Sequence, residues 1–144
     1  MTVSHILNGK GRGVITASSA ETVRSVARIL AEKRIGAVVV IDPQGKIEGI
    51  ASERDFVRAI AFEGAAALDR PIGELMTKNV RTCSPEDTES ELMALMTEHR
   101  IRHIPVLDDG KLAGIISIGD VVKFRIEAIE REAEEMKTYI SSAG

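Results

Sequence analysis

The residues best suited to chemistry stand in a short pattern that occurs twice, Gly-Ile-Ala-Ser-Glu-Arg-Asp at 49–55 and Gly-Ile-Ile-Ser-Ile-Gly-Asp at 114–120. In each copy an apolar run ends at a serine, and an aspartate follows three residues later. A serine and an acidic residue at this spacing form a helix N-cap, in which their side chains satisfy free backbone N–H groups. The same helix start can bind a phosphate through those N–H groups and the serine hydroxyl. The pattern therefore predicts two capped helix starts with the donors of an anion site.

The aspartates of the two copies, Asp55 and Asp120, add a second kind of chemistry. A carboxylate one turn into a helix can accept hydrogen bonds from the vicinal hydroxyls of a ribose, as acidic residues do in other nucleotide sites. Gly49 and Gly114, in the preceding apolar runs, would let a ligand approach the backbone. Phosphate and ribose together indicate a nucleotide. A single copy is equally consistent with a capped helix that binds nothing, so both interpretations stay open.

These copies belong to a longer internal repeat, in which residues 14–57 recur in register at 80–122. One residue is deleted between two short apolar runs, where a turn tolerates a change of length. Capping residues, one helical apolar face and two adjacent strand-like runs recur in each copy. Each copy therefore predicts a β-α-β-β-α unit.

One such unit cannot cover both faces of its own sheet. We therefore expect an α/β (α+β) fold in which the two repeats pack through their sheets with pseudo-twofold symmetry. The expected division is an N-terminal segment with the first repeat at 1–68, a linker with the second repeat at 69–126, and a C-terminal amphipathic helix at 127–144.

The C-terminal helix carries a heptad seam, because its apolar residues alternate at spacings of four and three: Val122, Ile126, Ile129, Ala133, Met136 and Ile140. A seam of under three heptads is too short to be stable alone. We expect it to pack against its copy in a homodimer, with packing on its own domain as the alternative.

Composition narrows the class of partner. The chain has 144 residues, a net charge of −3, 3% aromatic residues and no Trp, which argues against a nucleic-acid partner. No run approaches the roughly 18 apolar residues of a membrane span, and the N-terminus lacks the pattern of a signal peptide, so we expect a cytoplasmic protein and no membrane partner. The single cysteine, Cys83, is expected to be a buried apolar residue and excludes a cysteine-based metal site.

The duplicated pattern resembles a tandem CBS-domain pair, also called a Bateman module. The resemblance spans roughly residues 14–126 and includes the linker Met76-Thr77, the run Arg-His-Ile-Pro-Val at 102–106 and both Ser-x-x-Asp turns, in the expected order. The overall plan is similar to small stand-alone bacterial proteins of this family. The resemblance implies a non-enzymatic regulatory or energy-sensing module that binds AMP, ADP, ATP, NAD(H) or S-adenosylmethionine between the repeats, with no metal required. We expect its signal to pass through its shape or through contact with an unknown protein target.

The resemblance also implies two clefts, each built from both repeats. The preferred cleft is expected to use Asp120 for the ribose and Ser117 and Gly119 near the phosphate, together with Ile118, Arg102, His103, Ile35, Gly36, Ala37, Val14 and Ile15. The other cleft is expected to use Asp55, Ser52, Glu53, Arg54, Lys78, Asn79, Val80 and Ile101. The first is preferred because Arg102 and His103 stand where the first repeat has Gly36 and Ala37, which gives it extra phosphate donors. Lys10 and Arg12, in the glycine-rich lead-in at 8–13, are further candidates for a phosphate.

Two other functions stay open. An enzyme that processes nucleotides would need a metal-binding carboxylate cluster, or a nucleophile and a base, near the phosphates. Asp55 and Asp120 are the only repeated acids there, and both are assigned to ribose. A structural dimerisation protein with vestigial clefts would bind no nucleotide.

Overall fold

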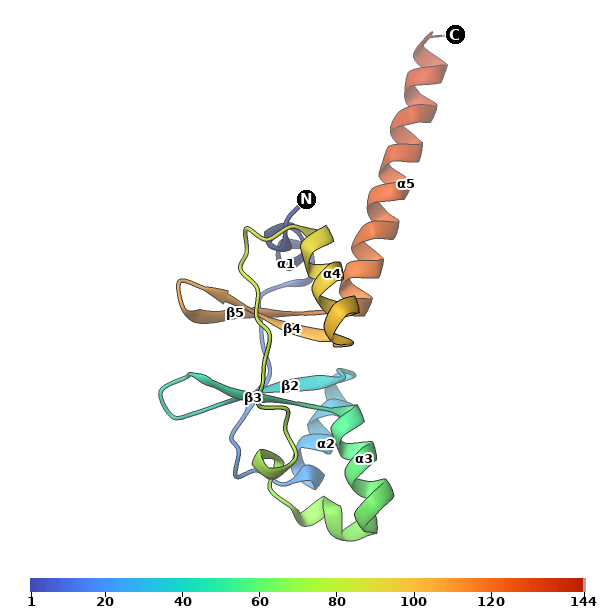
Figure 1. Cartoon of the computed structure of the whole chain (residues 1–144). Coiled ribbons are helices and arrows are strands. Elements are labelled where there is room, and N and C mark those ends of the chain that lie inside the picture. Colours follow the sequence, from blue (N-terminus) through green and yellow to red (C-terminus); the bar gives the residue numbers. More distant parts are fainter. Residues whose placement is uncertain (144) are drawn as a thin grey trace.

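The structure, a computed structural model, describes residues 1–143 and has two similar halves (Figure 1). The first half contains β1 (Thr16–Ala17), α2 (Val23–Lys33), β2 (Ala37–Ile41), β3 (Ile47–Ser52) and α3 (Glu53–Glu63). The second half contains α4 (Glu89–His99), β4 (His103–Asp108), β5 (Lys111–Ser117) and α5 (Ile118–Ala143). Helix α1 (Val3–Lys10) precedes them, and the 3-10 helices η1 (Gly64–Asp69) and η2 (Ile72–Glu74) lie between the halves in the chain.

Each half is built on a small sheet. In the first, β1 runs parallel to β2, and β2 pairs antiparallel with β3. In the second, β4 and β5 pair antiparallel, and Cys83 makes a single parallel bridge to Val106 in place of a first strand. The two sheets face each other in the middle of the molecule, with α2 and α3 on one outer side and α1, α4 and the base of α5 on the other (Figure 1). The predicted α/β architecture of two paired repeats is confirmed.

The capping residues place the helices as predicted. Thr22 and Thr88 are the N-caps of α2 and α4, and their hydroxyls accept hydrogen bonds from backbone N–H groups at 3.2 and 3.1 Å. Both helices end at an arginine in the left-handed conformation, Arg34 and Arg100, each with φ of 54°. Helix α3 ends at Glu63 because Gly64, with φ of 71°, breaks it and a 3-10 helix follows.

Two apolar clusters form the core. In the first half, Val26 and Leu30 of α2 pack against Val38 and Val40 of β2. Because side chains alternate along a strand, Val39 points to the opposite face, yet it is fully buried. The second half must therefore cover that face, which is the physical reason for the pairing of the sheets.

The segments that precede each repeat pack on the other repeat. Val3, Ile6 and Leu7 of α1 belong to the apolar cluster of the second half, whereas Ile72 of η2 belongs to that of the first. This exchange ties the halves together in addition to the sheet contact.

The same exchange fills the space beside Gly49 and Gly114. A side-chain Cβ at Gly114 would lie 2.6 Å from Leu7 Cδ2, and one at Gly49 would lie 2.7 Å from the carbonyl oxygen of Thr77. The expectation that these glycines admit a ligand to the strand backbone is wrong, because α1 and the linker already occupy that space.

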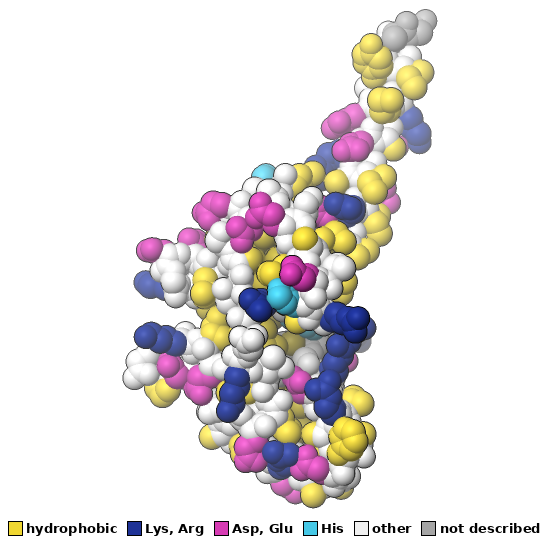
Figure 2. Space-filling view, in the orientation of Figure 1, with side chains coloured by type: hydrophobic (Ala, Val, Ile, Leu, Met, Phe, Trp, Pro, Cys, Tyr) yellow, Lys and Arg dark blue, Asp and Glu magenta, His cyan; other side chains and the backbone are white. Residues whose placement is uncertain are grey.

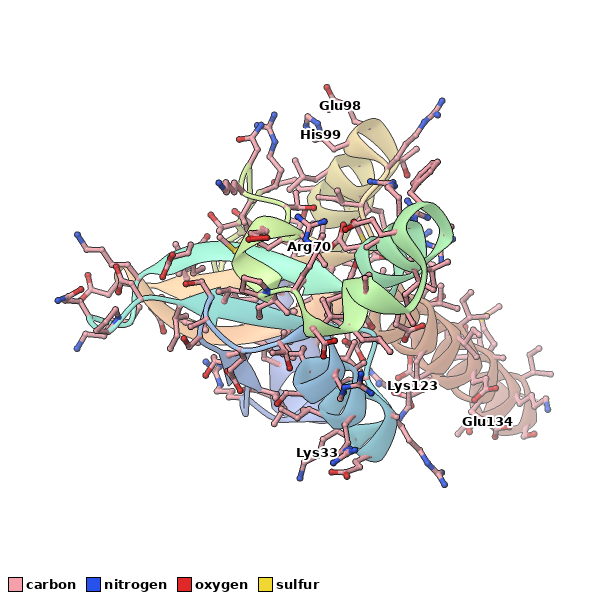
Figure 3. The ribbon with its side chains drawn as sticks, turned by 90° about the horizontal axis from the view of Figure 1, so that it is seen from below. Lys33, Arg70, Glu98, His99, Lys123 and Glu134 are labelled. Carbon is pink, nitrogen blue, oxygen red and sulfur yellow. The ribbon has the colours of Figure 1, made fainter. Side chains whose placement is uncertain are left out.

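The described part of α5 is one unbroken helix of 26 residues, so no turn marks the predicted boundary at 126; Gly144 lies outside the described residues. Figure 3 shows α5 leaving the body on the side away from the two β-hairpins, with Glu134 on its outlying part. Among the described helices, none is long and apolar enough to cross a membrane. Cys83 is buried as predicted, and burial raises the pKa of its thiol to about 12.

Candidate functional site

The first Ser-x-x-Asp turn, Ser52 to Asp55, caps α3 as the sequence predicts. The Asp55 backbone N–H donates to Ser52 Oγ at 3.4 Å, and the Ser52 backbone N–H and hydroxyl donate to Asp55 Oδ2 at 3.0 and 3.1 Å. None of these three hydrogen bonds uses Asp55 Oδ1, which has no hydrogen-bond partner among residues 1–143. The carboxylate is thus fixed through one oxygen and can accept a ligand hydroxyl through the other.

The second turn, Ser117 to Asp120, has the same reciprocal bonds and an additional cation. The Ser117 N–H donates to Asp120 Oδ2 at 2.8 Å, and the Asp120 N–H donates to Ser117 Oγ at 3.1 Å. Lys10 Nζ, at the end of α1, lies 2.6 Å from Asp120 Oδ2 and 2.8 Å from the carbonyl oxygen of Ile115. Burial acts to raise the pKa of Asp120, but the hydrogen bonds from Lys10 and Ser117 outweigh it and hold that pKa below its usual value.

The lead-in basic residues are therefore engaged within the chain. Lys10 holds Asp120, and Arg12 Nη2 donates to Asn8 Oδ1 at 3.2 Å and to Ser4 Oγ at 3.5 Å. The segment is also more regular than its glycines indicate, because residues up to Lys10 form α1.

A cavity of about 310 Å³ lies at the Ser52 to Asp55 turn, between the repeats. Four parts of the chain form it: Gly36 just before β2, the end of β3 with the start of α3, the linker after η2, and the segment that leads from α4 into β4. Its lining consists of Gly36, Ile50, Ser52, Glu53, Arg54, Asp55, Arg58, Thr77, Asn79, Val80, Arg81, Arg100, Ile101, Arg102 and His103. Figure 2 shows Lys and Arg side chains gathered along one edge of the molecule at the level where the halves meet.

His103 reaches across from the second repeat to Gly36 of the first. A side-chain Cβ at Gly36 would lie 3.2 Å from His103 Cε1 and Nε2, and 3.2 Å from Glu53 Oε1. Burial lowers the pKa of His103. The negative charges of Asp120 and Glu53 act to raise this pKa, and the positive charges of Lys10 and Arg102 act to lower it. Burial thus favours the neutral imidazole. The difference between Gly36-Ala37 and Arg102-His103 in the two repeats has a steric reason, since Gly36 leaves room for His103.

The structure distributes the predicted site residues as follows. Arg102, His103 and Gly36, predicted for the cleft at Asp120, line the cavity at Asp55. Of the set predicted for the Asp55 cleft, Lys78 is not part of the lining, and the other seven residues are. The remaining residues predicted for the preferred cleft are not part of the lining of this cavity: Asp120, Ser117, Ile118, Gly119, Val14, Ile15, Ile35 and Ala37. The preference for the Asp120 cleft stays a prediction.

Three arginines of the lining, Arg58, Arg81 and Arg100, are absent from the predicted set. Arg58 stands one helical turn after Arg54, and Arg81 and Arg100 are sequence neighbours of predicted residues. A count of basic residues around the predicted positions would have found them. Across residues 1–143, no group of three or more His, Cys, Asp or Glu side chains is placed to hold a metal ion.

Comparison with known proteins identifies the family to which the two repeats belong. The CBS-domain family matches residues 10–62 and 72–127, which are the two repeats. A CBS-domain-containing protein from Agrobacterium tumefaciens is 48% identical, with a TM-score of 0.84 over 86% of this chain and 92% of that one.

Two further solved structures carry ligands. The CBS domain pair of protein MJ0100, in complex with 5′-methylthioadenosine and S-adenosyl-L-methionine, is 27% identical, with a TM-score of 0.79 over 89% of this chain and 98% of that one. A CBS domain protein from Pyrobaculum aerophilum, complexed with AMP, is 29% identical, with a TM-score of 0.74 over 83% and 89% of the two chains. With both repeats matched by the family and the paired fold shared with these structures, the chain belongs to the CBS-domain family as a tandem pair.

Proposed function

We propose that this chain is a regulatory module, not an enzyme, that binds an adenosine-containing ligand in the cavity at Asp55. The observation that carries the proposal is the cavity itself, because it brings the capped start of α3 together with the linker and with basic residues of the second repeat. Asp55 Oδ1 accepts the ribose hydroxyls, and the arginines face the phosphate. Related CBS pairs in complex with AMP, 5′-methylthioadenosine and S-adenosyl-L-methionine support the adenosine part of the ligand.

The proposal ranks the Asp55 cavity above the cleft at Asp120. Arg102 and His103, which made the Asp120 cleft preferable from sequence, line the cavity at Asp55. In addition, Lys10 Nζ lies on the Asp120 carboxylate. This internal cation neutralises the carboxylate and occupies its Oδ2, so we propose that the Asp120 cleft is the weaker site.

Occupancy regulates only if the ligand favours one of two states of the protein or of its assembly. The proposed assembly is a homodimer formed through the apolar seam of α5, and the proposed output is contact with a target protein.

Titration calorimetry and thermal shift with AMP, ADP, ATP, NAD, NADH and S-adenosylmethionine test this function. We expect at least one ligand to bind, and saturation at about 100 times its Kd to add about 2.7 kcal/mol to the free energy of unfolding. Asp55→Asn should weaken binding at least tenfold, because the variant keeps a capping oxygen and loses the carboxylate charge. Asp120→Asn is the matched control and should leave the tight site intact.

Three outcomes contradict the proposal. If no ligand binds, the chain is a structural protein. If Asp120→Asn abolishes binding and Asp55→Asn does not, the ranking of the clefts is reversed. If the protein releases phosphate from ATP or ADP and Asp55→Asn stops the release, the chain is an enzyme.

A further inference from the structure

The cavity at Asp55 has an excess of positive charge. Its lining contains five arginines, Arg54, Arg58, Arg81, Arg100 and Arg102, against two carboxylates, Glu53 and Asp55. One of these carboxylates, Asp55, already accepts hydrogen bonds from the Ser52 backbone and hydroxyl.

The five guanidinium groups have no acidic partner within the described part of the chain, where no ion pair or carboxylate hydrogen bond includes them. Outside the cavity, three arginines have ion pairs: Arg24 with Asp69, Arg70 with Glu63 and Glu74, and Arg125 with Glu89. Four others in the described part of the chain have none: Arg12, Arg28, Arg34 and Arg131. What distinguishes the five arginines of the cavity is therefore that they line one space together.

One feature indicates that this arrangement costs stability in the ligand-free chain. Arg54 and Arg58 stand four residues apart on α3, a spacing at which like charges destabilise a helix. Stability lost at a site without compensating contacts is typical of a binding function. The left-handed conformation of Arg100 is not specific to the cavity, because Arg34 has the same φ of 54° outside it.

The arginines also surround the cavity. Arg54 and Arg58 come from α3 of the first repeat, Arg81 comes from the linker, and Arg100 and Arg102 come from the approach to β4 of the second repeat. One phosphate group accepts bidentate contacts from a small number of guanidinium groups. Five groups on several sides match a longer chain of negative charge.

We propose, building on the proposed function, that this cavity selects an adenosine ligand with a chain of two or three phosphates over AMP and over the sulfonium cation S-adenosylmethionine. The adenosine half is held by Asp55 and the linker, and the polyphosphate half by the arginines. The family resemblance does not make this choice, since related CBS pairs in complex with AMP and with S-adenosyl-L-methionine are both known.

The test measures Kd for ADP, ATP, AMP, NADH, S-adenosylmethionine and inorganic tripolyphosphate by calorimetry, with EDTA present so that no metal masks the phosphates. We expect ADP or ATP to bind at least tenfold more tightly than AMP, and S-adenosylmethionine to bind weakest among the adenosine ligands. The affinity for ADP and ATP should fall steeply with rising salt.

Arg100→Gly and Arg34→Gly form a matched pair of variants. Both remove an arginine from the left-handed residue that ends a helix, and only Arg100 lines the cavity. Neither variant should lower the melting temperature, since glycine suits this conformation. Arg100→Gly should weaken ATP binding about tenfold and AMP binding less, whereas Arg34→Gly should leave both unchanged.

The outcomes separate this inference from the proposed function. If AMP or S-adenosylmethionine binds as tightly as ADP and ATP, or if Arg100→Gly leaves ATP binding unchanged, the polyphosphate inference is wrong and the adenosine site stands. If tripolyphosphate binds and none of the adenosine ligands does, the proposed function is wrong. If nothing binds, both are wrong.

Discussion

Asp120 is held by donors from opposite ends of the chain, the Ser117 backbone N–H beside it and Lys10 Nζ at the end of α1. These bonds keep the pKa of Asp120 below its usual value of 3.8. An aspartate with a depressed pKa in the folded state stabilises the fold at pH values above its unfolded pKa. That contribution is lost as the pH falls through the lower, folded pKa. The Lys10–Asp120 pair therefore gives the fold a defined sensitivity to acid.

Lys10→Met tests this contribution. The variant should unfold about 1 kcal/mol more easily than the parent at pH 7, a magnitude suited to a partly exposed pair. The difference should be smaller at pH 2 than at pH 7, since the contribution is lost as the pH falls through the lowered pKa of Asp120. Urea denaturation at both pH values measures it, and Lys33→Met, at an exposed position on α2, is the control. An equal loss at pH 7 and pH 2 would mean that Lys10 acts through its apolar stem and not through its charge.

At the scale of the element, α1 is held against the second repeat by close contact with β5. Leu7 is fully buried, and its Cδ2 lies 2.6 Å from the position that a Cβ on residue 114 would take. Since α1 also carries Lys10 to Asp120, its packing on β5 fixes the position of that ion pair.

Gly114→Ala should destabilise the fold by about 1–3 kcal/mol, the usual cost of overpacking a filled core. Gly9→Ala is the matched control on α1, because nothing lies within 4 Å of a Cβ there and alanine favours helix. Leu7→Ala should relieve the clash, so that Gly114→Ala costs less in that background. The melting temperatures of the parent, the two single variants Gly114→Ala and Leu7→Ala, and the double variant measure this coupling. Equal effects of Gly114→Ala with and without Leu7 would refute the contact.

Local elements were predictable, and their long-range contacts were not. The caps at Thr22, Thr88 and Ser52 and the alternation of apolar residues depend on neighbours a few positions away, so the sequence indicates them directly. The packing of Leu7 against Gly114 joins segments more than 100 residues apart, and no local periodicity encodes it. The same limit applies to the site: both Ser-x-x-Asp turns were found from local sequence, but the sequence did not indicate that Arg102 lines the cavity at Asp55.

At the scale of the whole molecule, the two halves share a backbone plan and differ in charge. The turn at Asp55 opens into a cavity lined by arginines, whereas the turn at Asp120 carries Lys10. Gly36 and Arg102 occupy equivalent positions in the two repeats. The second repeat therefore has a guanidinium group where the first has a glycine without a side chain, which contributes to the difference in charge. The duplicated fold thus places different charges at two equivalent turns, which is the physical basis for proposing that they bind a ligand with unequal affinity.

The molecule also leaves an apolar surface uncovered along α5. The base of α5 is anchored by the ion pair of Arg125 with Glu89, and the rest extends away from the body (Figure 1). The predicted seam residues Val122, Ile126, Ile129, Met136 and Ile140 are 47 to 64% exposed, so α5 does not pack back on its own domain through them. A seam at heptad spacing is self-complementary, which favours a second copy of this chain as its partner.

Ile129→Glu tests the proposed dimer. It places a charge in the middle of the seam, and paired seams would then bury two carboxylates, so the variant should be a monomer at concentrations where the parent has twice the mass of one chain. Arg131→Glu is the matched control, because it introduces the same residue on the outer face of α5 and should stay dimeric. Light scattering after size exclusion measures the mass, and far-UV circular dichroism should show less helix in the monomer, since a single projecting helix is only marginally stable. A parent that is monomeric at every concentration, or an Arg131→Glu variant that dissociates like Ile129→Glu, would contradict pairing through the seam.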